Sequence, residues 1–122
     1  MVAAPVPLEA EEGKTLVAYL RLRGHKFTHI PNETGSSPEA RRRAIRMKQQ
    51  GTNKGFVDYI VIVPTSRGID RTIGIELKRQ RGSTVSPEQR EWVAALTRAG
   101  VESRICKGAA AAIEFIEEVR KS

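Results

Sequence analysis

The hydrophobic pattern predicts two central β-strands, at residues 55–63 and 74–78. The first reads Gly-Phe-Val-Asp-Tyr-Ile-Val-Ile-Val and the second reads Gly-Ile-Glu-Leu-Lys. Both runs are rich in β-branched and aromatic residues and are bounded by Gly, Pro or polar turns, as buried strands usually are. The polar segment 64–71 between them predicts a hairpin loop.

Other periodic segments flank this hairpin. Leu16, Val17 and Leu20 form one stripe of a helix over residues 8–23, which Gly24 ends. A strand over residues 27–31 is stopped by Pro31. The remaining elements are a helix with Ser86 as N-cap and Gln89 as its capping-box partner, a strand at 101–106 and a closing amphipathic helix at 109–120.

This order of elements predicts an α/β fold with a single mixed sheet flanked by helices. The chain has 122 residues, which suits one domain and is too short for two. Residues 1–7 contain two prolines and no periodicity, so we expect a loose tail there. The domain should then cover residues 8–122.

The two central strands carry charges where a core should have none. Side chains alternate between the faces of a strand, so Asp58 lies on one face of the first strand, and Glu76 and Lys78 share one face of the second. If the strands pair with these faces together, two carboxylates and an amine converge. An unpaired buried carboxylate is unfavourable, and a divalent cation would compensate it.

The chemistry of this cluster favours Mg²⁺ or a similar ion. Mg²⁺ binds a few carboxylate oxygens, keeps several waters and accepts substrate phosphate oxygens. One Asp and one Glu at a strand end suit that preference. Lys78 beside them could hold or activate a water molecule.

A basic segment lies between the first strand and the central hairpin. The 24 residues from 32 to 55 are too many for a bare connection, and Pro38 after Ser37 opens a helix within them. We expect the cations of this segment to contact phosphates, although a solvated basic face is the simpler alternative. These cations are Arg41, Arg42, Arg43, Arg46, Lys48 and Lys54.

Composition narrows the class of protein. Lys and Arg number 21 against 14 Asp and Glu, a formal charge of +7 that favours an anionic partner, with nucleic acid ahead of membrane. One cysteine, Cys106, and two histidines cannot build a tetrahedral zinc site. No apolar run reaches the roughly 18 residues of a membrane helix, and no signal peptide is visible, so we expect a cytoplasmic protein.

The residues also carry a family resemblance. Asp58 followed by Glu76-Leu77-Lys78 resembles the PD-(D/E)XK nuclease signature, with Val57 where the family pattern usually has Pro. The wider string is similar to the VRR-NUC (virus-type replication-repair nuclease) branch of that superfamily, over about residues 9–108. It comprises His29-Ile30-Pro31-Asn32-Glu33, Gly55–Asp58, Gly74–Lys78, Gly82, Ser86-Pro87-Glu88-Gln89 and Trp92.

The resemblance implies a restriction-endonuclease-like αβββαβ core and a Mg²⁺- or Mn²⁺-dependent endodeoxyribonuclease. Asp58 and Glu76 would bind the ion, with the Leu77 carbonyl as third ligand, while Lys78 and Gln89 serve the attacking water. A Glu on the first helix would complete the site; Glu9 is the better match by spacing and Glu12 the second choice. The family further implies branched DNA such as four-way (Holliday) junctions, a homodimer, and a phage or DNA-repair setting.

Two alternatives stay open from the sequence. The domain could be a nuclease for flaps or single strands instead of junctions, and only labelled substrates separate these. It could also be a basic DNA-binding module without catalysis, against which the intact Asp58, Glu76 and Lys78 argue. A metabolic α/β protein finds little support, because no Gly-rich phosphate loop is present.

Overall fold

Four strands form one mixed sheet in the order β1-β2-β3-β4. The computed structural model describes residues 5–31 and 35–122. β1 pairs with β2 and β2 with β3 antiparallel, whereas β4 runs parallel to β3. The elements are α1 (Glu9–Arg23), β1 (Lys26–His29), α2 (Pro38–Gln49), β2 (Tyr59–Pro64), β3 (Asp70–Lys78), α3 (Pro87–Arg98), β4 (Ser103–Lys107) and α4 (Ala109–Arg120).

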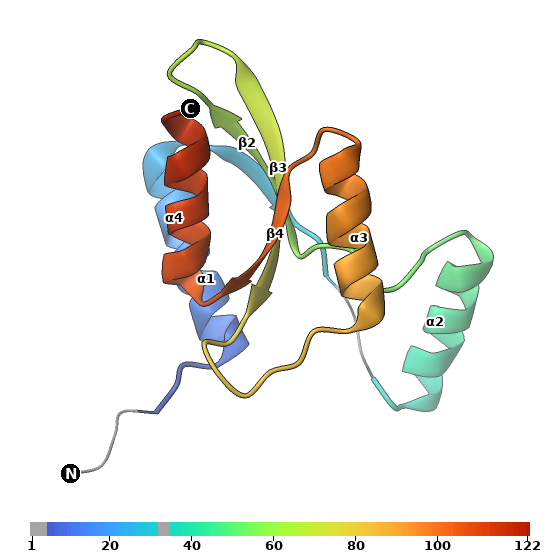
Figure 1. Ribbon diagram of the computed structural model, residues 1–122. Helices are drawn as coiled ribbons and strands as arrows, with labels where there is room; N and C mark the ends of the chain where they lie inside the picture. Colours follow the sequence, from blue (N-terminus) through green and yellow to red (C-terminus); the bar gives the residue numbers. More distant parts are fainter. Residues whose placement is uncertain (1–4, 32–34) are drawn as a thin grey trace.

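The predicted α/β fold with a single mixed sheet and flanking helices is confirmed. Helices α1 and α4 cover one face of the sheet, α3 lies on the other face, and α2 stands away from the rest (Figure 1). The core lies under α1 and α4, where Leu16 and Leu20 meet Phe115 and Ile116. Every second residue of β2 points into this core, so Tyr59, Val61 and Val63 are buried.

The first central strand is shorter than predicted at its start. It begins at Tyr59, because Gly55 has a φ of +91° that no strand allows. Asp58 therefore lies just before β2, although its N–H still donates to the Ile75 carbonyl at 3.0 Å. The second strand is longer than predicted and starts at Asp70.

Helix α3 begins as the sequence predicts. Ser86 Oγ accepts from the Gln89 N–H at 3.2 Å, and Gln89 Oε1 accepts from the Ser86 N–H at 3.0 Å. This reciprocal pair is a capping box, and it fixes the first turn of the helix.

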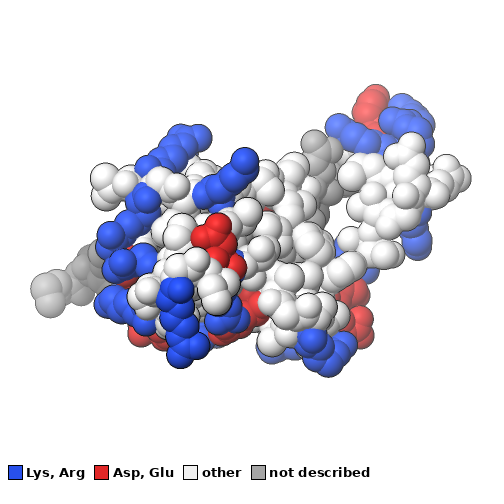
Figure 2. Space-filling model, turned by 90° about the horizontal axis from the view of Figure 1, so that it is seen from above, with Lys and Arg blue, Asp and Glu red and all other residues white. Residues whose placement is uncertain are grey.

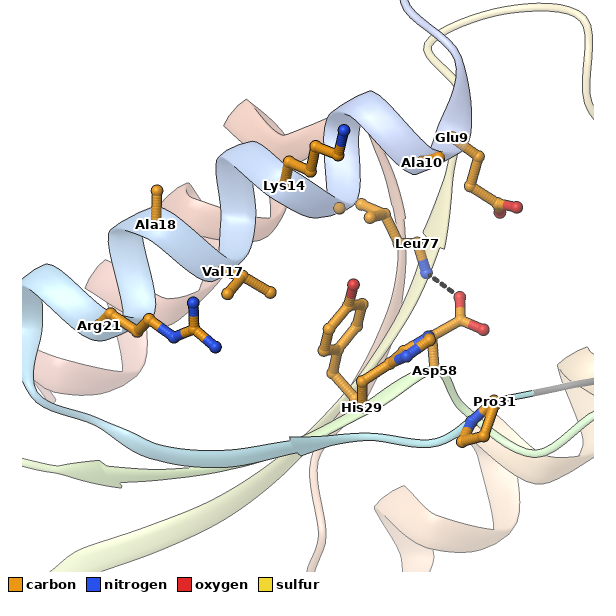
Figure 3. A pocket seen from close by; sticks show the side chains of 12 residues that line it. Glu9, Ala10, Lys14, Val17, Ala18, Arg21, His29, Pro31, Asp58 and Leu77 are labelled. Atoms are coloured by element: carbon orange, nitrogen blue, oxygen red, sulfur yellow. Dashed lines mark hydrogen bonds between the residues drawn. The ribbon is translucent and has the colours of Figure 1, made fainter.

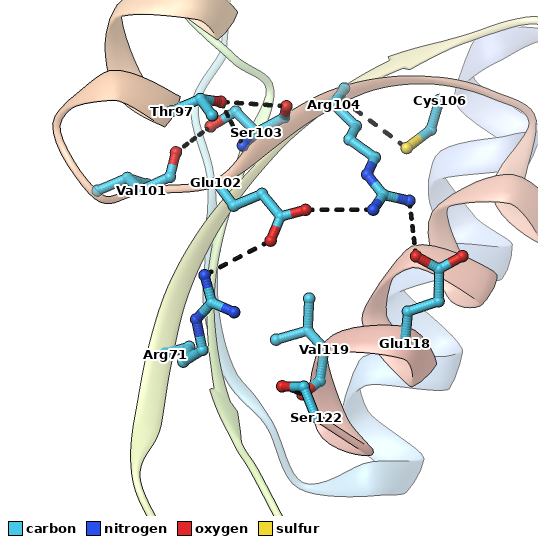
Figure 4. A network of polar contacts seen from close by, with 10 residues as sticks. All are labelled: Arg71, Thr97, Val101, Glu102, Ser103, Arg104, Cys106, Glu118, Val119 and Ser122. Carbon is cyan, nitrogen blue, oxygen red and sulfur yellow. Dashed lines mark hydrogen bonds and ion pairs between the residues drawn. The ribbon is translucent and has the colours of Figure 1, made fainter.

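A polar network ties the far end of the sheet to α4 (Figure 4). Glu102 pairs with Arg71 of β3 at 3.5 Å and with Arg104 of β4 at 3.1 Å. The Arg104 guanidinium also reaches Glu118 at 2.9 Å and lies 4.3 Å above the Phe115 ring. This network holds the end of the sheet that is farthest from the candidate site.

Part of the predicted tail can be placed. The carbonyls of Val6 and Pro7 accept hydrogen bonds of 2.9 and 3.1 Å from the Arg79 guanidinium, so these two residues are held against the end of β3. Residues 1–4 of the tail, and Asn32 and Glu33 of the family string, lie outside the described residues. In the described ranges no helix is long and apolar enough to cross a membrane.

Candidate active site

The hairpin brings the two predicted carboxylates to the same place. Asp58 precedes β2 and faces the end of β3, where its Oδ2 accepts the Leu77 N–H at 2.8 Å. Glu76 lies one residue earlier on β3 and is only 1% exposed. Asp58 is therefore oriented by the backbone of the segment that carries Glu76.

Glu76 has fewer partners than a buried carboxylate needs. Its Oε2 accepts from Gln89 Nε2 at 3.3 Å and lies 4.0 Å from Lys78 Nζ. Its Oε1 finds no hydrogen-bond donor among the described residues. Burial first, and the neighbouring Asp58 carboxyl second, raise the pKa of Glu76 to about 9, against the lowering effect of Lys78.

Asp58, Glu76, Lys78 and Gln89 thus come together from three separate stretches of sequence, since Glu76 and Lys78 share β3. An orphaned carboxylate oxygen beside a second carboxylate is a donor set that suits a hard, oxygen-binding cation such as Mg²⁺ or Mn²⁺. In residues 5–31 and 35–122, no three His, Cys, Asp or Glu side chains form a group that could hold a metal ion. The pair needs oxygens of another kind, from backbone, water or substrate, to complete a shell.

The two candidate acids of the first helix differ in their surroundings. Glu9 lines a pocket together with Asp58 (Figure 3). Its charge also contributes, as the smallest cause, to the raised pKa of Glu76. Glu9 thus faces the site, although it does not join Asp58 and Glu76 in a three-carboxylate group.

Glu12 is engaged elsewhere. Its Oε1 accepts the Ala109 N–H at 3.2 Å and its Oε2 accepts from Gln80 Nε2 at 3.1 Å. Glu12 is 6% exposed, and it closes the start of α4, where Gly108 has no side chain to do so. Glu12 is therefore occupied by structural contacts, whereas Glu9 lines the pocket that contains Asp58.

The pocket beside Asp58 contains cations that the sequence reasoning missed. It has a volume of about 640 Å³, and Lys14 and Arg21 line it together with Glu9 and the His29 ring (Figure 3). Lys14 and Arg21 are seven residues apart, two helical turns, so they occupy one face of α1. That spacing was visible in the sequence, but nothing there indicated that this face borders Asp58.

The basic segment forms the protruding helix α2 and the turn after it (Figures 1 and 2). Three of its six predicted DNA-contacting cations, Arg43, Lys48 and Lys54, line a groove between α2 and α3. The other three do not line it. Arg41 donates to the Ser36 carbonyl at 2.9 Å, Arg42 lies 3.7 Å from Glu39, and Arg46 lies elsewhere on the helix.

Comparisons with known proteins identify the family to which this domain belongs. The family model described as VRR-NUC domain matches residues 12–110. A solved structure titled "VRR_NUC domain protein" superposes with a TM-score of 0.72 at 20% identity, over 95% of this chain and 90% of the other. No curated protein matches. The match covers most of the chain and includes Asp58, Glu76, Lys78 and Gln89, so the chain belongs to the VRR-NUC domain family and is a nuclease-type domain.

Proposed function

We propose that this protein is a Mg²⁺- or Mn²⁺-dependent endonuclease that hydrolyses phosphodiester bonds in branched DNA. The observation that carries the proposal is the convergence of Asp58, Glu76 and Lys78 beside an open pocket. Cations line that pocket and the neighbouring groove, and the chain has a formal charge of +7. A nucleic acid backbone supplies the matching negative charge.

The carboxylates of Asp58 and Glu76, with the Leu77 carbonyl, would hold the ion. A bound divalent cation supplies Lewis-acid polarisation of the phosphoryl group and lowers the pKa of a bound water. The hydrogen bond from the Leu77 N–H keeps Asp58 oriented toward the site before any ion arrives. Glu9 faces the same pocket and extends its acidic wall.

Lys78 would stabilise the developing negative charge, and Gln89 would orient the attacking water. Lys78 is half-buried and held near Glu76, so its ammonium can stabilise negative charge on the phosphoryl oxygens in the transition state. Gln89 can orient the attacking water through its amide. In the reaction, water oxygen bonds to phosphorus, the bond to the leaving sugar oxygen breaks, and that oxygen takes up a proton.

Branched substrates and a homodimer belong to the same proposal. One chain brings together one Asp58–Glu76 pair, and a four-way junction needs two matched cuts. A two-fold dimer presents two such sites to a two-fold substrate. A flap is cut on one strand only, so a nuclease acting on flaps needs a single chain.

The decisive experiment compares isosteric variants in a cleavage assay. We expect Asp58→Asn and Lys78→Met to lower the rate at least about a hundredfold, because each removes charge that acts in the transition state. Asp70→Asn is the control, since Asp70 lies in the same strand as Lys78 but at the opposite, exposed end of β3. The substrates should be duplex, flap, splayed-arm and four-way junction DNA with Mg²⁺, Mn²⁺ or EDTA.

Folding of each variant is checked by circular dichroism and thermal melting. If Asp58→Asn and Lys78→Met are folded and cleave as fast as Asp70→Asn, the proposal is wrong. Cleavage that persists in EDTA would contradict the role of the divalent ion.

A further inference from the structure

A second cavity, a groove between α2 and α3, lies next to the carboxylate site. Its volume is about 920 Å³, and it is bounded by one wall on each helix. No residue of α2 is buried, and Met47 of that helix is 38% exposed toward the groove. Figure 2 shows the hollow that separates this helix from the body of the molecule. The apolar side chains of Ile45 and Met47 are therefore left exposed on α2.

The two walls of the groove differ in chemistry. Arg43, Lys48 and Lys54 lie on α2 and the turn that follows it. Across the groove, α3 contributes the half-buried Trp92 ring, which is held edge to face against Phe56 at 4.9 Å between ring centres. Two acids also belong to the α3 wall: Glu88, which lies 3.5 Å from Lys54, and the exposed Glu91.

This division suits a single nucleic acid strand better than a duplex. A duplex presents phosphates outward and hides the faces of its bases, so it offers nothing to an apolar wall. An unpaired strand offers phosphates on one side and base faces on the other, and base faces stack on aromatic side chains. The cations of α2 and of the turn after it match the phosphates, and the Trp92 ring of α3, with Met47 of α2 across the groove, matches the bases.

The groove also reaches the candidate active site. Gln89 lines it and donates to Glu76 at 3.3 Å, while Pro31 borders both the groove and the pocket that contains Asp58. A strand lying in the groove would arrive directly at the two carboxylates.

We propose that this groove binds an unpaired DNA strand, with its phosphates against Arg43, Lys48 and Lys54 and its bases against Trp92 and Met47. This inference rests on the proposed nuclease function and adds to it a preference for branched DNA in which a strand is unpaired at the branch point.

The only tryptophan of the chain gives a direct test. The inactive variant Asp58→Asn is titrated with a single-stranded oligonucleotide, and with the duplex of the same sequence, while Trp92 fluorescence is recorded. Stacked bases quench indole emission, so we expect strong saturable quenching by the single strand and little by the duplex. Equal quenching by both, or none by the single strand, would overturn the proposal.

A matched pair of variants separates groove binding from general charge. Met47→Glu and Ile45→Glu place the same charge on the same exposed helix, but only Met47 lines the groove. In the Asp58→Asn background, we expect Met47→Glu to weaken binding of a splayed-arm DNA about tenfold more than Ile45→Glu does. Both variants should weaken duplex binding equally.

Failure of this inference can be told apart from failure of the proposed function. If Met47→Glu and Ile45→Glu bind splayed-arm DNA equally, the groove proposal falls, whatever the cleavage assay shows. If Asp58→Asn cuts as fast as the parent protein, the nuclease mechanism falls, and the groove proposal loses the function on which it rests.

Discussion

At the scale of single residues, the buried carboxyl group of Glu76 lowers the stability of the fold. An ionised carboxylate that is 1% exposed and lacks one of its hydrogen-bond partners is unfavourable in a protein interior. Ile75 and Leu77 point into the core on the other face of β3, so Glu76 is buried without belonging to the hydrophobic core. Buried carboxylates with strongly shifted pKa values cluster at functional sites, and the raised pKa of Glu76 supports the role proposed for it.

Glu117 is the opposite case, a carboxylate that stabilises the fold. It accepts hydrogen bonds from the Tyr19 hydroxyl and from the Arg120 guanidinium at 2.8 Å, and it pairs with Arg23 at 3.1 Å. Tyr19 first, and Arg120 second, lower the pKa of Glu117 to about 2. These contacts join α1 to α4.

This lowered pKa predicts a specific dependence of stability on pH. Because the folded-state pKa is below the unfolded value of 4.5, the stabilisation is present above pH 4.5 and is lost as pH falls toward 2. We expect Glu117→Gln to be less stable than the parent protein by about 1 kcal/mol at pH 7 and equally stable near pH 2. Urea denaturation at several pH values measures this.

The control for this prediction is Glu114→Gln, which changes an exposed carboxylate on the same helix. It should follow the parent protein at every pH. A difference between Glu117→Gln and the parent that stays constant from pH 7 to pH 2 would contradict the assignment.

At the scale of elements, the start of α3 depends on one glycine. Gly55 has a φ of +91°, and a Cβ there would lie 2.7 Å from Glu88 Cβ and 2.9 Å from the Gln89 nitrogen. The segment before β2 therefore passes against the first turn of α3. This contact places Gln89 next to Glu76.

Gly55→Ala should consequently disturb both stability and activity. We expect a loss of about 2 kcal/mol from strain and overpacking, and a fall in cleavage rate because Gln89 moves with the displaced turn. Gly51→Ala is the matched control: its φ is +96°, but a Cβ there meets nothing within 4 Å. Chemical denaturation and the cleavage assay distinguish the two variants, and equal behaviour of both would argue against the packing explanation.

The elements that the sequence predicted well are those with strong periodicity or clear end signals. The helix at 109–120 matches α4, and the capping box at Ser86 is present as expected. The error at the start of β2 came from extending its apolar pattern back through Phe56 to a glycine that adopts a turn conformation. Face alternation along the strands was enough to bring Asp58, Glu76 and Lys78 together.

Other parts of the candidate site could not be predicted from the sequence, because they depend on how the elements pack. Helical spacing placed both Glu9 and Glu12 on the inner stripe of α1, and it contains no information about which of them meets the start of α4. Nor could it show that Lys14 and Arg21 border Asp58, because that depends on how α1 crosses the sheet. Helix α2 was predicted as basic, but its separation from the core, and hence the groove, depends on tertiary packing.

At the scale of the whole molecule, the proposed dimer has a direct test. We expect sedimentation equilibrium at micromolar concentration to give a protein mass of about twice the 13.5 kDa of one chain, after the mass of any bound four-way junction is subtracted. An inactive chain mixed in excess with active protein should then convert paired cuts into single nicks. A mass of one chain both with and without DNA would rule out the dimer.

The carboxylate of Glu12 joins parts of the chain that lie 97 positions apart, since it accepts the first amide of α4. A helix whose first N–H groups are capped by its own neighbouring residues can fold and unfold alone. The first N–H of α4 is instead capped by a side chain of α1. The two helices should therefore melt as one cooperative unit. Truncation of the N-terminal residues through Glu12 should therefore destabilise the C-terminal helix α4 first.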